Sequence, residues 1–87
     1  MVYVVSYELR AGRRDYGQLY QELKNSPGWW HYLTSTWLVS TDETPDELYA
    51  RLEATIDSRD GLLIIEAGRT RQGWLPEEAW AWIRDHI

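Results

Sequence analysis

The chain has 87 residues, the length of one small domain, and a formal net charge of −5. It contains no cysteine, which excludes disulfide frameworks and thiolate metal sites. The negative charge repels nucleic acid at long range, so any such binding depends on a local group of basic residues.

An unusual aromatic content accompanies this short length. Six tryptophans and six tyrosines occur without a phenylalanine, and each such side chain buries on the order of 150 to 250 Å² when it is packed. This is more aromatic surface than the core of a small monomer holds, and a domain of this size gains stability from association. We therefore predict a homodimer.

No targeting or membrane segment is recognisable. The first residues lack a basic region and a small-residue cleavage site, and the longest aliphatic run, residues 62–65, is far shorter than the roughly 20 residues that span a membrane. We expect a cytoplasmic protein without membrane association.

The first expected element is an apolar strand over residues 2–9. Alternation places Tyr3 and Tyr7 on one face of the strand and Ser6 and Glu8 on the other. The strand therefore ends with one carboxylate on a defined side of the sheet.

A helix is expected next. Asp15 is the predicted N-cap, with Gln18 at the capping-box position. An apolar stripe at helical spacing starts at Tyr16 and continues through residue 24. The turn-forming residues 25–28 then end the helix.

Residues 29–33 and 36–39 are rich in aromatic and β-branched side chains, which indicates two short strands or one bent strand. A second helix is expected over about residues 45–57. Thr44 is its predicted N-cap, proline follows at the first helical position, and Glu47 completes a capping box.

The run over residues 62–67 is too uniformly apolar for a half-exposed strand, which predicts a central strand covered on both faces. A last helix opens at residues 75–78, where a proline precedes two acids. We expect it to dock through Trp80 and Ile83, with Trp74 anchoring the preceding link.

The succession of strands and helices is βαββαβ followed by one helix, which is the ferredoxin-like split arrangement. We predict a single α+β domain, a ferredoxin-like βαββαβ sandwich with an extra C-terminal helix. Its core spans residues 2–67, and residues 68–87 form the link and last helix. The first two helices should cover one sheet face and a partner protomer the other.

Four stretches carry a resemblance to a known family: the strand at residues 3–9, Arg13 and Arg14 before the first helix, Thr34 to Trp37, and Thr44 to Leu48. Together they resemble the small CRISPR-associated adaptation protein that is the second of the two core adaptation components. Looser relatives are the VapD-type toxins and the SinR-like proteins.

The resemblance implies a homodimer that packs through its sheets, with one strand-end acid of each protomer facing the other across the dimer axis to hold a divalent metal. The matching acid is Glu8, which becomes the implied catalytic residue and Mg²⁺ ligand of a metal-dependent endonuclease acting on RNA or DNA. Two departures are visible. Glu8 is one methylene longer than the aspartate of the family, and residues 74–87 replace a terminal strand that reaches the partner.

The residues themselves leave the role of Glu8 open. It is either a hard-cation ligand that lowers the pKa of a bound water or an acid paired with Arg10, Arg13 or Arg14. These arginines either bind phosphates beside a helix N-terminus or remain solvated in the loop.

Other residue combinations have simpler interpretations. Tyr3, Tyr7 and Trp37 could form a base-stacking surface, but packing in the core or in a dimer interface is the interpretation we favour. His31 has no second histidine or suitably spaced acid, so we interpret it as an ordinary strand residue. A nucleophile and base built from Ser6, Ser35 and His31 lacks any positional motif, and we reject it.

Two functions remain. The first is a metal-dependent nuclease with paired Glu8 residues and Arg10, Arg13 and Arg14 at the nucleic acid. The second is a non-catalytic dimeric interaction or nucleic-acid-binding module that retains the fold without the chemistry.

Overall fold

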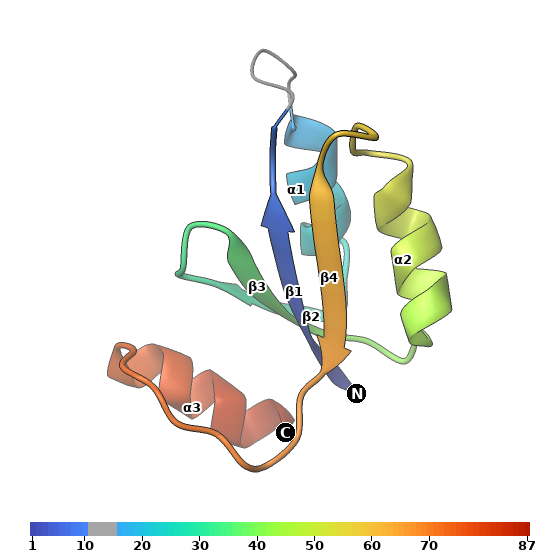
Figure 1. Cartoon of the computed structure of the whole chain (residues 1–87). Coiled ribbons are helices and arrows are strands. Elements are labelled where there is room, and N and C mark those ends of the chain that lie inside the picture. Colours follow the sequence, from blue (N-terminus) through green and yellow to red (C-terminus); the bar gives the residue numbers. More distant parts are fainter. Residues whose placement is uncertain (11–15) are drawn as a thin grey trace.

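The computed structural model describes residues 1–10 and 16–87 (Figure 1). Its elements in chain order are β1 (Val2–Glu8), α1 (Gly17–Lys24), β2 (Gly28–His31), β3 (Thr36–Ser40), α2 (Pro45–Glu53), β4 (Gly61–Glu66) and α3 (Glu77–His86). The predicted α+β class and the predicted succession of strands and helices are confirmed. No helix in the described residues is long and apolar enough to cross a membrane.

The four strands form one antiparallel sheet in the order β2-β3-β1-β4. The strands that α1 connects, β1 and β2, are separated by β3, and the strands that α2 connects, β3 and β4, are separated by β1. The central strands are therefore β1 and β3. The residues of the 29–33 and 36–39 runs form two strands of a hairpin, in which Trp30 pairs with Leu38.

The prediction that the 62–67 run is a central strand covered on both faces was wrong. The strand β4 pairs with β1 alone within the described chain and lies at the sheet edge. Leu62 and Ile64 pack on the core, but Leu63 and Ile65 point to the other face and are 55% and 54% exposed. An apolar run at an edge therefore leaves apolar surface in solvent.

The core lies between the sheet and the pair α1 and α2, which cover the same face (Figure 1). Its buried residues are Tyr3, Val5, Tyr7, Leu19, Leu23, Trp37, Val39, Leu48 and Leu52. Inside it the indole nitrogen of Trp37 donates a hydrogen bond to the hydroxyl of Tyr7 at 3.0 Å. Tyr3, Tyr7 and Trp37 are thus core residues, and a base-stacking surface made of them is excluded.

The sequence predicted the start of the second helix more accurately than the start of the first. The helix α1 begins at Gly17 after Tyr16, whose side chain makes no capping hydrogen bond; the predicted N-cap Asp15 lies outside the described residues. The helix α2 begins with the predicted capping box, in which Thr44 and Glu47 each bind the backbone of the other.

The end of α2 was predicted four residues too late. The helix ends at Glu53, and the chain continues in a tighter turn. The amide of Thr55 donates to the Leu52 carbonyl at 3.0 Å, and that of Ile56 donates to the Glu53 carbonyl at 3.3 Å. These bonds span three residues rather than four. The hydroxyl of Thr55 also donates to the Leu52 carbonyl at 2.7 Å. A threonine side chain that binds this carbonyl favours such a tighter turn over further α-helix.

The last helix lies on the sheet side opposite α1 and α2, toward the start of β1 (Figure 1). Its residues Ala79 and Ile83 are buried, and Trp80 is half-buried. The His86 ring of α3 and the Ser40 side chain of β3 lie close to Gly28, where an added Cβ would be 3.1 Å from the Ser40 Cβ and 3.4 Å from the His86 ring. The expectation that Trp74 anchors the link was wrong, because its side chain is 97% exposed.

Candidate functional site

Glu8 lies at the end of β1, on the sheet face that α1 and α2 do not cover. Its side chain is 70% exposed and accepts a hydrogen bond from the guanidinium of Arg10, with 3.0 Å between Nη2 and Oε2. The structure therefore contains the pairing with arginine that the sequence offered as the alternative to metal binding.

Arg10 makes further contacts with the loop before β4. Its amide donates to Oδ1 of Asp60 at 2.7 Å, and its Nη1 donates to the Arg59 carbonyl at 3.3 Å. Nearby, the hydrogen bond from the Arg59 side chain lowers the pKa of Asp57 below its ordinary value. Charges at this end of the sheet thus occur as opposite pairs, which limits the attraction of Arg10 for a phosphate. Arg13 and Arg14 lie outside the described residues.

A complete metal site is not present in one copy of the described chain. Among residues 1–10 and 16–87 there is no group of three or more histidine, aspartate or glutamate side chains placed to hold a metal ion. Metal binding by Glu8 with ligands from a second protomer remains an untested prediction.

His31 behaves as the ordinary strand residue that the sequence suggested. Its ring stacks on Trp37 with 3.9 Å between centroids, and its Nε2 lies 3.3 Å from the Thr34 carbonyl oxygen. Ser6 instead lies beside Thr36, with 3.4 Å between their hydroxyl oxygens. Ser6 and His31 form no nucleophile and base pair.

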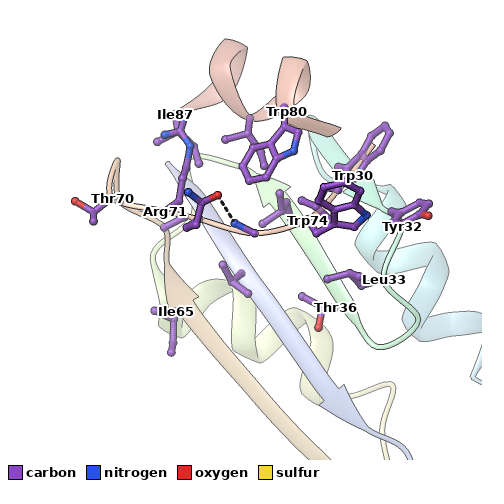
Figure 2. A pocket seen from close by; sticks show the side chains of 18 of the residues that line it. Trp30, Tyr32, Leu33, Thr36, Ile65, Thr70, Arg71, Trp74, Trp80 and Ile87 are labelled. Carbon is purple, nitrogen blue, oxygen red and sulfur yellow. Dashed lines mark hydrogen bonds between the residues drawn. The ribbon is translucent and has the colours of Figure 1, made fainter. Parts of the chain in front are cut away.

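A cleft lies between the second face of the sheet and the C-terminal segment (Figure 2). Its volume is about 430 Å³, within the usual range for small-molecule sites of roughly 300 to 1,000 Å³. Its floor includes Val4 and Leu38 from the central strands, and its cover includes Trp80 and Ile83 from α3. We call this feature the α3 cleft.

The α3 cleft is mainly apolar, and one of the residues that line it, Trp30, carries an unusual polar group. The indole nitrogen of Trp30 is buried and has no hydrogen-bond partner in the described part of the chain. A buried donor without an acceptor costs about 1 to 3 kcal/mol. The charged residues that line the cleft, Glu66 and Arg71, are both solvent-exposed.

Sequence reasoning assigned Trp80 and Ile83 to docking of the last helix but did not predict the cleft. A signal was present: Val4 and Leu38 are large apolar residues that alternate with the core residues of β1 and β3, and Trp30 alternates with Trp29 and His31 in β2. Such alternation predicts a second apolar sheet face. It does not tell which segment covers that face.

Comparison with known proteins gave no match to a family model, a curated protein or a solved structure. The family resemblance therefore remains a proposal, and the function has to be argued from the geometry of the chain.

Proposed function

We propose that this protein is a non-catalytic interaction module that forms a homodimer through the sheet face opposite α1 and α2. The observation that supports the proposal is the exposure of Leu63 and Ile65, which are 55% and 54% exposed on that face. Contiguous apolar residues on a sheet edge are a surface that proteins usually cover.

A second copy suits this surface for a geometric reason. In the described chain β4 pairs only with β1, so Leu63 and Ile65 lie at the sheet edge, where a second copy can reach them. A two-fold axis places the same patch of each protomer against its mate, so one apolar patch covers the other. The domain is also small and lacks cysteine, which makes dimerisation a useful source of stability.

We further propose that the fold is of the ferredoxin-like class. The sheet order from the far edge is β4-β1-β3-β2, in which each βαβ unit is split by a strand of the other. This arrangement is compatible with the resemblance to the small CRISPR-associated adaptation protein, the VapD-type toxins and the SinR-like proteins. Fold alone carries no activity.

The experiment is a sedimentation-equilibrium comparison of wild type, Leu63→Glu and Tyr49→Glu. Tyr49 is the matched control, because it is a large apolar side chain, 45% exposed, on the opposite side of the molecule in α2. We expect a wild-type dimer at micromolar concentration, a folded Leu63→Glu monomer and a dimeric Tyr49→Glu. A well-folded wild-type monomer at high micromolar concentration would contradict the proposal.

The second candidate is a metal-dependent endonuclease with Glu8 as catalytic and metal-ligating residue. It is favoured by the position of Glu8, an exposed carboxylate on the same face as Leu63. A two-fold axis passing close to Glu8 would bring the two Glu8 carboxylates together. Without a cation they would repel each other, so such a dimer requires Mg²⁺ or an arginine between them.

Two measurements test this candidate. Millimolar Mg²⁺ or Mn²⁺ should raise the melting temperature of wild type but not of Glu8→Gln, and RNA or DNA cleavage should disappear in Glu8→Ala. Nucleic-acid binding should weaken with salt and in the Arg13→Ala/Arg14→Ala double variant, with Arg10→Ala as a third variant. A melting temperature indifferent to both cations, together with no cleavage, would leave Glu8 as a structural partner of Arg10.

A further inference from the structure

We propose that the α3 cleft is a binding site for a neutral, planar aromatic molecule that carries a hydrogen-bond acceptor. This goes beyond the proposed self-association and does not depend on it.

The first argument is the unpaired donor. Buried indole N–H groups in proteins almost always have an acceptor, and the Trp37 indole in this chain follows that rule with the Tyr7 hydroxyl. The Trp30 indole is buried with no acceptor in the described residues. The nitrogen is covered by neighbouring atoms, so an occupant of the cleft that displaces them and presents an acceptor atom to this nitrogen would remove the deficit.

The second argument is the aromatic lining. Trp30, Trp74 and Trp80 come from β2, the link and α3 and all line the cleft (Figure 2). Trp74 leaves nearly its whole side chain in solvent, at 97% exposure. Flat rings gain most from a flat partner, since offset stacking and edge-to-face contact add to the burial of apolar area. A planar aromatic ligand would give Trp74 a surface to pack against.

The third argument concerns charge. Glu66 and Arg71 are the charged residues of the described lining, they have opposite signs, and both side chains are exposed. Figure 2 shows Arg71 on the side of the cleft away from Tyr32. The apolar interior therefore holds no buried charge to neutralise a charged ligand, and burial of an unpaired charge is costly. The occupant is neutral.

Size agrees with this ligand class. The cleft volume of about 430 Å³ accommodates a fused two-ring molecule, and pockets in this range bury most of the surface of a small ligand.

The test uses two probes of the same shape, isoquinoline and naphthalene, at a pH of about 8 where isoquinoline is neutral. Isoquinoline has a ring nitrogen that accepts a hydrogen bond, whereas naphthalene has none. Binding is followed by the tryptophan indole N–H signals in a ¹⁵N–¹H spectrum of the full chain, with the Trp30 signal assigned by its disappearance in Trp30→Phe. Affinities come from the same titrations.

We expect isoquinoline to bind wild type about ten-fold more tightly than naphthalene, the equivalent of one ordinary hydrogen bond. Isoquinoline should move the Trp30 N–H signal downfield, and naphthalene should not. In Trp30→Phe the ratio of the isoquinoline affinity to the naphthalene affinity should fall to about one, while naphthalene still binds. In Trp29→Phe, a control on the other face of β2, the preference should remain.

Trp74→Ala provides a variant whose folding is not at risk, because the side chain is almost fully exposed. The Trp74→Ala substitution should weaken the binding of both probes without changing the ratio of their affinities. Titration of Leu63→Glu repeats the measurement without the proposed dimer surface, so failure of self-association and failure of ligand binding are distinguishable. Equal affinities in wild type and Leu63→Glu are expected, because Leu63 does not line the cleft. A preference that survives in Trp30→Phe, or no binding of either probe at millimolar concentration, would overturn the proposal.

Discussion

Tyr7→Phe is the substitution whose effect the structure predicts most directly. It removes one hydroxyl from the core and leaves the phenyl ring in place. That hydroxyl accepts a hydrogen bond from the Trp37 indole nitrogen at 3.0 Å and donates a longer one, 3.4 Å, to the Thr34 carbonyl. Both rings are buried, so water does not replace the lost acceptor at Trp37.

The magnitude follows from the group left unpaired. A buried donor without its acceptor costs about 1 to 3 kcal/mol. The bond to Thr34 adds little, because it is long and Thr34 is exposed to water. A loss of 1 kcal/mol lowers the melting temperature of a domain of 60 to 100 residues by about 4 to 8 °C. We expect Tyr7→Phe to lower the free energy of unfolding by about 1 to 3 kcal/mol and the melting temperature by about 4 to 24 °C.

The assay is urea unfolding followed by far-ultraviolet circular dichroism, with the midpoint compared at constant slope. The control is Tyr49→Phe, which removes the same hydroxyl from a half-exposed tyrosine on α2. It should lie within about 0.5 kcal/mol of wild type. A Tyr7→Phe variant equally close to wild type would refute the reasoning and show that the Trp37 nitrogen finds another acceptor.

Three further predictions concern the helices. The hydrogen bond from Arg51 holds the pKa of Glu43 below its ordinary value of 4.5. The ionised Glu43 therefore stabilises the folded state at higher pH, and this stabilisation is lost as the pH falls through the folded-state pKa. The urea midpoint of Glu43→Gln should fall less between about pH 6 and pH 3 than that of wild type, and an equal fall would contradict the prediction. Thr44→Ala removes the cap from the Glu47 amide and should cost about 1 kcal/mol in urea unfolding; an unchanged midpoint would argue against the cap. Ile83→Ala should cost about 2 to 5 kcal/mol and speed amide exchange in α3, whereas unaltered exchange would mean that α3 docks through other residues.

Much of the secondary structure was determined by the sequence alone, because its signals are local. The start of α2 depends on Thr44, Pro45 and Glu47, which act within one helical turn and were read correctly. The end of α1 was equally predictable, because residues 25–28 do not favour further helix. The alternation along β1 assigned Tyr3 and Tyr7 to one face without knowledge of any neighbouring strand.

The tertiary structure alone decided which strands lie at the edges. The run over residues 62–67 is apolar on both faces whether it is central or not, and its place depends on pairing with residues about 60 positions away in β1. For the same reason the sequence did not predict that Trp74 remains in solvent, since tryptophan composition says nothing about whether a facing surface exists.

The candidate sites divide in the same way. Glu8 was placed at the end of β1 from its own strand, and its pairing with Arg10 was one of two alternatives. The folded structure shows that pairing, and it shows no group of three metal-ligating side chains among the described residues. The α3 cleft is assembled from β1, β2, β3, β4, the link and α3, so no local pattern contains it. Whether the Trp30 nitrogen meets an acceptor depends on the positions of all these segments, because a hydrogen bond requires its partner within about 3 Å in a suitable direction.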